Sequence, residues 1–119
     1  MKILVVDDDD EVTSFFCSFL KHLGLEAKSA NSAKEAIKLF YTYQPDWLFL
    51  DINMPHMDGL TLFKRLKEIE PQIKVIMITG RDDQESFNKA KELGAIDYIV
   101  KPLELEALHK TIKNYIIKE

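Results

Sequence analysis

The stretch Ile3-Leu4-Val5-Val6-Asp7-Asp8 decides the fold, because it is a short apolar run that ends abruptly in two carboxylates. Three more apolar runs end in a polar residue: Trp47-Leu48-Phe49-Leu50 before Asp51, Val75-Ile76-Met77-Ile78 before Thr79, and Tyr98-Ile99-Val100 before Lys101. Short apolar runs that alternate with helical patterns are typical of buried parallel strands. The sequence therefore predicts a sheet whose strands end in polar residues at one shared edge.

Segments of helical periodicity separate these runs and define the expected topology. Strands are expected at residues 2–7, 25–30, 46–51, 73–79 and 96–100. Helices are expected to begin near residues 10, 32, 60, 82 and 104, with residues 52–59 as a loop that contains Pro and Gly. Five alternating strand and helix units predict an α/β fold with a doubly wound, five-stranded parallel sheet. The expected strand order is 2-1-3-4-5, the flavodoxin-like (βα)5 arrangement.

Apolar residues at helical spacing predict the helix faces that pack on this sheet. In the first helix they are Val12, Phe15, Phe16, Phe19, Leu20 and Leu23. In the last helix they are Leu105, Leu108, Ile112 and either Tyr115 or Ile116. Ser32 precedes Glu35 by the spacing of a capping box, which predicts the start of the second helix.

Composition limits the class of protein. A chain of 119 residues with 46% hydrophobic content is sufficient for one core, so we expect a single domain over residues 1–119. The formal net charge of −4 gives no electrostatic sign of direct nucleic-acid binding. No apolar stretch approaches the ~18 residues of a membrane span, and the first residues lack a signal-peptide pattern. Cys17 is the one cysteine, which fits a reducing compartment, so we expect a cytoplasmic domain without a membrane contact.

Asp7, Asp8 and Asp51 are expected to meet, because a crevice forms at the carboxyl ends of the strands beside the switch point between strands one and three. Two carboxylates about 4 Å apart repel by roughly 4 kcal/mol at an effective dielectric of about 20, so three need a cation. Oxygen ligands with open water positions favour Mg²⁺, and Mn²⁺ can substitute. Two alternatives stay open: the acids of residues 7–11 could cap the first helix, and Asp51 could cap the next loop.

The same crevice has the groups for phosphoryl chemistry. A carboxylate such as Asp51 can act as a nucleophile and form an aspartyl phosphate. That reaction depends mainly on stabilising the charge of the phosphoryl oxygens. Lys101 supplies a positive charge and Thr79 supplies a hydroxyl donor. Either residue alone could be an ordinary strand end, and their joint placement favours a phosphoryl site.

Four motifs in this order resemble the receiver domain of two-component response regulators, over essentially the whole chain. They are Ile3-Leu4-Val5-Val6-Asp7-Asp8, Leu50-Asp51-Ile52-Asn53-Met54-Pro55-His56-Met57-Asp58-Gly59, Ile76-Met77-Ile78-Thr79-Gly80 and Asp97-Tyr98-Ile99-Val100-Lys101-Pro102. The resemblance implies a phosphorylation-switched signalling module. In such a module Asp51 accepts a phosphoryl group from a phosphohistidine on a sensor histidine kinase or a histidine phosphotransfer protein.

The resemblance also implies a metal site. Asp8 and Asp51 would bind Mg²⁺ directly, Asp7 would hold a metal-bound water, and the backbone carbonyl of Asn53 would be a further ligand. Lys101 would pair with the phosphoryl oxygens, and the family places a cis peptide bond after it.

Switching and regulation are implied by the same resemblance. Thr79 would bond the phosphoryl group, and Tyr98 would turn inward to fill the space that Thr79 leaves. The surface of the fourth helix, fifth strand and fifth helix would then control a downstream protein or a fused effector domain. The chain would be a monomer or would dimerise on phosphorylation. Asn53 and Arg81 flank the phosphoryl group and would tune dephosphorylation.

Val12 and Phe15 lie near the start of the first helix, where the family docks its phosphodonor. They are expected either to form that docking surface or to belong to the ordinary core stripe. His56 is expected to be a solvated loop residue.

Two other functions compete with the signalling module. A Mg²⁺-dependent phosphatase with an aspartyl nucleophile needs a second acid two residues after the nucleophile, and Asn53 occupies that position. A flavin- or nucleotide-binding protein would need a phosphate loop, and neither glycine fingerprint is present. We therefore expect a phosphoacceptor that promotes its own phosphotransfer and dephosphorylation and is not a turnover enzyme.

Overall fold

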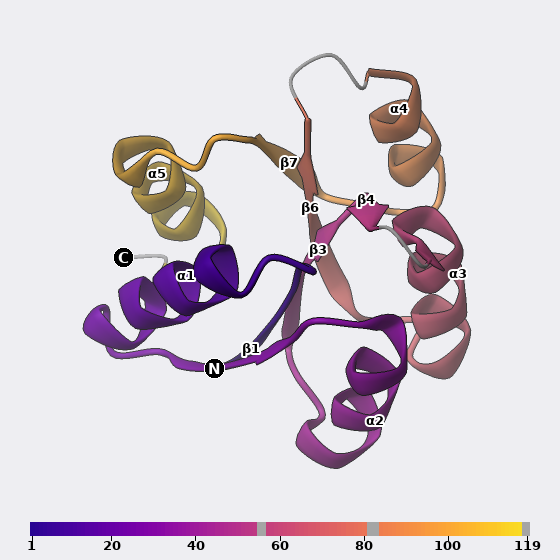
Figure 1. Cartoon of the computed structure of the whole chain (residues 1–119), viewed down its shortest axis with the longest axis horizontal. Helices are drawn as coiled ribbons and strands as arrows, with labels where there is room; N and C mark the ends of the chain where they lie inside the picture. Colours follow the sequence, from indigo (N-terminus) through magenta and orange to yellow (C-terminus); the bar gives the residue numbers. More distant parts are fainter. Residues whose placement is uncertain (55–56, 81–83, 118–119) are drawn as a thin grey trace.

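The structure is a computed structural model that describes residues 1–54, 57–80 and 84–117 (Figure 1). Its central sheet contains the parallel strands β1 (Lys2–Val6), β2 (Glu26–Ala30), β3 (Trp47–Asp51), β6 (Lys74–Thr79) and β7 (Asp97–Val100). A separate hairpin is formed by β4 (Asn53–Met54) and β5 (Met57–Asp58). The helices are α1 (Asp10–His22), α2 (Ala33–Tyr43), α3 (Gly59–Ile69), α4 (Gln84–Glu92) and α5 (Leu105–Tyr115). The sheet order β2-β1-β3-β6-β7 confirms the predicted doubly wound topology.

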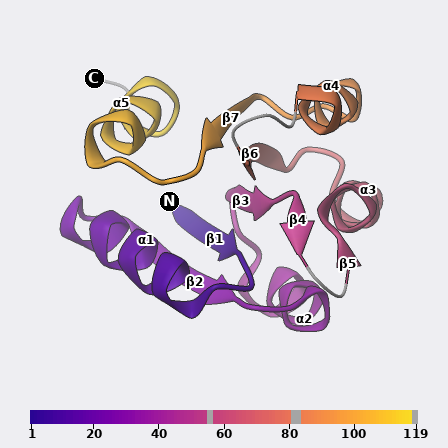
Figure 2. The ribbon, with the colours of Figure 1, turned by 45° about the horizontal axis from the view of Figure 1, so that its top comes forward.

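Helices cover both faces of the sheet, with α1 and α5 on one face and α2, α3 and α4 on the other (Figures 1 and 2). The side chains of β1 divide between the two layers. Ile3 and Val5 belong to the core under α1 and α5, whereas Leu4 and Val6 belong to the core under α2, α3 and α4. Successive strand residues point to opposite faces, so a sheet covered on both sides needs continuous apolar runs. This arrangement explains why β1 and β3 have no hydrophobic alternation in the sequence.

Two helix starts follow the predicted capping chemistry. Asp9 Oδ1 accepts hydrogen bonds from the backbone N–H groups of Glu11 and Val12, at 2.9 and 3.4 Å. Ser32 Oγ accepts from the Glu35 N–H at 3.2 Å. The helix-capping alternative therefore holds for Asp9, the N-cap of α1. The expected capping acids of α4, at residues 82–83, lie outside the described residues.

The segment predicted as a loop at residues 52–59 contains the β4–β5 hairpin, so that prediction was wrong in part. The hairpin has only two antiparallel pairs, Asn53 with Asp58 and Met54 with Met57. Two-residue strands are too short to give a hydrophobic period, which is why the sequence showed only turn signals. His56 lies outside the described residues.

Two residues predicted to face the core are exposed instead. Phe15 has 41% of its surface accessible, because its neighbour Phe16 faces the sheet and packs on Phe49 with ring centroids 4.7 Å apart. Leu105 is 51% exposed at the first residue of α5, while Leu108 and Ile112 are fully buried. Ile116 rather than Tyr115 completes the buried stripe. In the described part of the chain, no helix has both the length and the apolar character to cross a bilayer.

Gly59 allows α3 to begin against the end of β3. A Cβ atom at this position would fall on the backbone oxygen of Asp51 and lie 2.7 Å from the Cα of Ile52. The Gly59 N–H also donates to the Ile52 carbonyl at 2.9 Å. Since backbone atoms cannot move aside cheaply, the absence of a side chain at Gly59 fixes the path of the chain after Asp51.

We expect Gly59→Ala to lower the free energy of unfolding by about 2 kcal/mol, because the added methyl group overpacks against backbone. Urea denaturation of the two proteins measures this difference. Gly80→Ala is the matched control, since its Cβ would lie 4.0 Å from the nearest atom, Asn53 Nδ2. Equal unfolding free energies for wild type and Gly59→Ala would show that the α3 start can shift without cost.

Candidate functional site

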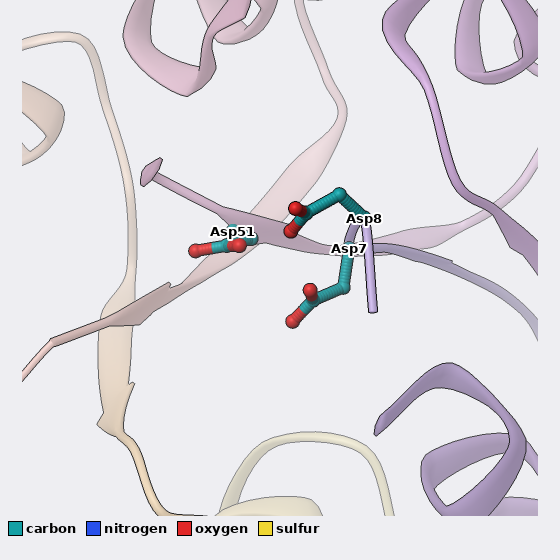
Figure 3. A group of neighbouring side chains, drawn as sticks. All are labelled: Asp7, Asp8 and Asp51. Carbon is teal, nitrogen blue, oxygen red and sulfur yellow. The ribbon is translucent and has the colours of Figure 1, made fainter. Parts of the chain in front are cut away.

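The end of β1 and the end of β3 bring three carboxylates together. Asp7 and Asp8 follow β1, and Asp51 is the last residue of β3. These strands pair in parallel, with Val6 opposite Leu50, so the residues after them emerge side by side. One carboxylate oxygen from each acid lies within 4.8 Å of the other two, and Figure 3 shows the three side chains converging at this edge. The structure therefore confirms the predicted acidic cluster.

The three acids differ in burial. Asp7 is fully buried and Asp51 is 2% exposed, whereas Asp8 is exposed. Asp7 Oδ1 accepts a hydrogen bond from the Asp9 N–H at 3.0 Å, and Asp51 Oδ1 accepts from the Asn53 N–H at 3.1 Å. Each buried carboxylate is thus oriented by the backbone two residues further along the chain. The second oxygen of each is left to face the crevice.

Lys101 faces both second oxygens. Its Nζ atom lies 2.9 Å from Asp7 Oδ2 and 3.3 Å from Asp51 Oδ2. The bond to Asp51 is a hydrogen bond, while Asp7 Oδ2 has only the ion pair and accepts no hydrogen bond from the described residues. The Lys101 N–H donates to the Thr79 carbonyl at 2.8 Å, and the peptide bond to Pro102 is cis. Residues from the ends of β6 and β7 therefore complete the crevice.

Burial controls the ionisation of this group. Removal from water raises the pKa of Asp51 from 3.8 to about 6, the negative charge of Asp7 adds to the rise, and Lys101 opposes it. Burial alone would lower the pKa of Lys101, but its contacts with Asp7 and Asp51 prevail and raise it. One ammonium thus serves two buried carboxylates, and a third carboxylate lies beside them. The net negative charge favours a further cation in the crevice.

Thr79 and Tyr98 occupy different environments. Thr79, at the end of β6, is 2% exposed, and its hydroxyl donates to the Gly80 carbonyl at 3.2 Å. Tyr98 is 36% exposed, and its ring stacks on Phe87 of α4 with centroids 4.0 Å apart. The Tyr98 ring thus lies on the outside in this structure. Its inward position stays a prediction for the phosphorylated protein.

The remaining predicted site residues lie around the crevice. Asn53 is exposed in β4 and contributes the N–H bonded to Asp51. Val12 and Phe15 line a groove of about 250 Å³, together with Lys101 and the two residues after it. A larger cleft of about 770 Å³ lies between the ends of α2 and α3 and contains none of the predicted site residues. Arg81 lies outside the described residues.

Two features of the site were missed in the sequence. Lys101 was assigned to the phosphoryl group alone, yet its shortest ion pair is with Asp7. Pro102 and Leu103 line the groove beside Phe15, a position that the sequence pattern does not predict. The pairing of Lys101 with Asp7 could have been predicted, because two buried acids near one lysine must share its positive charge.

Comparisons with known proteins agree with this geometry. Residues 3–113 match the family model of the response regulator receiver domain. The chain is 34% identical to the regulatory protein AtoC of Escherichia coli (strain K12), covering 94% of this chain but 24% of AtoC. It is 30% identical to sporulation initiation phosphotransferase F of Bacillus subtilis (strain 168), covering 97% of this chain and 93% of the relative.

A solved structure shows the same fold. The receiver domain protein (CheY-like) from Methanospirillum hungatei JF-1 superposes with a TM-score of 0.87 at 30% identity, covering 95% of this chain and 90% of that one. The agreement extends over nearly the full length of both chains.

The raised pKa of Asp51 predicts a pH-dependent penalty. Its ionised form is disfavoured in the folded state, so the contribution of Asp51 to the free energy of unfolding falls as the pH rises from about 4 to about 6. Asp51→Asn removes this penalty, and we expect its free energy of unfolding at pH 7.5, without divalent cations, to exceed that of wild type by about 1–3 kcal/mol.

The same comparison at pH 3.5 is the internal control, because Asp51 is then largely protonated in both states and the two proteins should be nearly equal. Glu68→Gln, which removes one negative charge from an exposed side chain, is the control for the change in net charge. A difference between wild type and Asp51→Asn that does not change with pH would contradict the raised pKa.

Proposed function

The chain belongs to the family of response regulator receiver domains, and we propose that it works as a phosphorylation switch centred on Asp51. In this proposal Asp51 accepts a phosphoryl group from a phosphohistidine with Mg²⁺ bound in the crevice, and all 119 residues form one receiver unit. The donor is a sensor histidine kinase or a histidine phosphotransfer protein. Receiver domains are regulatory switches rather than classical enzymes, so the product is a changed surface and not a released compound.

The position of Asp51 carries the proposal. It is 2% exposed, has two other carboxylates within 4.8 Å, and holds an ammonium 3.3 Å from Oδ2. A burial that raises its pKa also leaves its carboxylate poorly solvated, which suits a nucleophile. Burial raises the pKa of Asp51 despite the neighbouring ammonium, so the partners of this carboxylate do not fully offset its removal from water. We therefore assign the cost at Asp51 to function.

The proposed step is a transfer between a nitrogen and an oxygen. A carboxylate oxygen of Asp51 forms a bond to phosphorus while the bond from phosphorus to the donor imidazole nitrogen breaks. The electron pair of that bond stays on the imidazole, which takes up a proton. Lys101 offers its ammonium to the phosphoryl oxygens as their charge enters the crevice. The contact of Lys101 Nζ with Asp51 Oδ2 at 3.3 Å supports this role.

The donor set of the crevice fits Mg²⁺. All candidate ligands are oxygens, and one oxygen from each of the three acids lies within 4.8 Å of the other two, with Lys101 as the ammonium that faces Asp7 and Asp51. We propose that Asp8 and Asp51 bind the ion directly, that Asp7 holds a bound water, and that the Asn53 carbonyl is a further ligand. Mn²⁺ can take the same place. The ion, when bound, neutralises charge on the phosphoryl oxygens during transfer.

We propose that Thr79 and Tyr98 transmit the change. The Thr79 hydroxyl now bonds the Gly80 carbonyl, and a phosphoryl oxygen would be a stronger, charged acceptor for it. Movement of Thr79 would open space that the Tyr98 ring, now outside, can fill. The two positions then form a two-state element that phosphorylation biases.

The output surface in this proposal is formed by α4, β7 and α5. It already exposes the apolar side chains of Ile96, Tyr98, Val100 and Leu105, at 42%, 36%, 37% and 51%. Such a patch suits a protein partner. The partner is a separate protein or a fused effector domain, and the module is a monomer or dimerises on phosphorylation. AtoC is about four times longer than the matched segment, whereas sporulation initiation phosphotransferase F is nearly the same length.

Other parts of the proposal concern lifetime and location. Asn53 and Arg81 are proposed to tune dephosphorylation, because they lie two residues after Asp51 and Thr79. An amide at Asn53 has no acidic proton to give a leaving group, which disfavours a turnover phosphatase. The free and buried Cys17 fits a reducing cytoplasm, and the net charge of −4 disfavours direct nucleic-acid binding.

We expect wild type to incorporate phosphate from acetyl phosphate only when Mg²⁺ or Mn²⁺ is present, and Asp51→Asn to incorporate none. Phosphate content is measured by intact-protein mass spectrometry, with circular dichroism to show that the variant is folded. The stability gain predicted for Asp51→Asn makes unfolding a poor explanation for its loss of labelling. Full labelling of Asp51→Asn would refute the assignment.

We expect Phe15→Ala to slow phosphotransfer from a protein donor by about tenfold, because truncation of an exposed aromatic anchor weakens docking. The donor is whichever phosphorylated histidine kinase transfers fastest to wild type in a panel. Labelling by acetyl phosphate should be unchanged, since that donor needs no docking surface. Tyr41→Ala, which truncates a 60% exposed aromatic residue on α2, is the matched control. An unchanged transfer rate in folded Phe15→Ala would remove the docking role.

A further inference from the structure

We propose that Asp97 and Tyr115 form a latch that ties the C-terminal end of α5 to β7 and so transmits the state of Tyr98 to α5. The proposal rests on the phosphorylation switch proposed above and adds a route by which that switch reaches the last helix. Asp97 and Tyr115 are positioning residues in this account, because neither touches the reacting group.

The carboxylate of Asp97 bonds two different elements at once. Its Oδ1 atom accepts a hydrogen bond from the Tyr98 N–H at 2.8 Å, and its Oδ2 atom accepts one from the Tyr115 hydroxyl at 2.7 Å. Both bonds have a charged acceptor, which makes them stronger than neutral hydrogen bonds. The bond to Asp97 also raises the pKa of the Tyr115 phenol, as expected for a phenol that donates to a carboxylate. A shift of the backbone at Tyr98 therefore moves the Asp97 carboxylate, which accepts the hydrogen bond from Tyr115 of α5.

Tyr115 is held on its other side by the core. It is the last residue of α5, and its ring lies against Trp47 with centroids 6.3 Å apart. Trp47 is the first residue of β3 and is only 3% exposed, so its side chain is held in place by the core. The ring contact leaves the Tyr115 hydroxyl aimed at the start of β7. The end of α5 is consequently attached both to the core, through Tyr115 and the buried Ile112 and Ile116, and to the strand that carries Tyr98.

Tyr98 itself connects the latch to α4. Its ring stacks on Phe87, a residue of α4, while its N–H bonds Asp97. Contacts thus run without a gap from α4 through β7 to α5. In this account an inward turn of the Tyr98 ring breaks the contact with Phe87, and the accompanying shift of the Tyr98 backbone displaces the Asp97 carboxylate. Coupling of this kind requires a two-state element that both ends contact, and Tyr98 has that position.

A simple structural tether is the alternative to a latch. A tether would raise the stability of α5 equally in the phosphorylated and unphosphorylated protein. A latch makes the protection of the last turn of α5 depend on the phosphorylation state. The two accounts are therefore separated by the difference in α5 protection between the phosphorylated and the unphosphorylated protein. A loss of stability that is equal in both states does not change that difference.

The test is hydrogen exchange of the backbone amides of residues 112–115, with and without acetyl phosphate and Mg²⁺, in wild type and in Tyr115→Phe. In wild type we expect phosphorylation to change these exchange rates by about five- to tenfold, the factor for one hydrogen bond made or broken. In Tyr115→Phe the rates should already differ from those of unphosphorylated wild type, and phosphorylation should change them less than twofold. Tyr41→Phe, which removes an exposed hydroxyl on α2, is the matched control and should behave as wild type.

Labelling at Asp51 separates the two proposals. If Tyr115→Phe is labelled at the wild-type rate but retains the full phosphorylation-dependent change, the latch is wrong and the phosphorylation switch stands. If wild type is not labelled at all, the proposed function itself fails. Asp97→Asn is a second variant that removes the charged acceptor without touching the contact of Tyr115 with Trp47. It should lose the same coupling, and retention of the full phosphorylation-dependent change in either variant would overturn the latch.

Discussion

Two buried carboxylates share a single ammonium in this protein, and the chemistry of the site depends on that shortage of positive charge. Lys101 lies 2.9 Å from Asp7 and 3.3 Å from Asp51, and the exposed Asp8 adds a third negative charge nearby. The pKa of Asp51 is raised to about 6 because Lys101 cannot fully compensate for burial and for Asp7. Because the crevice carries excess negative charge, a divalent cation bound there stabilises the folded protein. A ligand that brings its own counterion has the same effect.

The topology of the fold creates that condition. Parallel strands covered on both faces deliver their next residues to one edge, and the neighbouring strands β1 and β3 deliver acids there. The strand order and the meeting of Asp7, Asp8 and Asp51 could be predicted from the sequence, because short apolar runs that alternate with helical segments imply a parallel sheet with its polar strand ends at one edge. The hairpin β4–β5 could not be predicted, since two-residue strands leave no periodic signal.

Side-chain choices within an element were the other limit of prediction. Phe15 and Phe16 are adjacent on α1 and equally apolar, yet only Phe16 is buried. Hydrophobic periodicity shows roughly how wide the apolar face of a helix is. It does not show which residues at the margin of that face are buried, because this depends on where the sheet stops. The exposed Phe15 and the outward Tyr98 are therefore visible only in three dimensions. Both lie on surfaces that the proposed function uses, one beside Lys101 and one on β7.

The central claim is that Asp51 alone becomes an acyl phosphate. Reduction of the phosphorylated protein with sodium borohydride converts an aspartyl phosphate into homoserine, and peptide mass spectrometry then locates the altered residue. The account predicts homoserine at position 51 and at no other acid, in a yield that follows the phosphate content. Homoserine at position 7 or 8, or phosphate without any reducible acyl group, would contradict it.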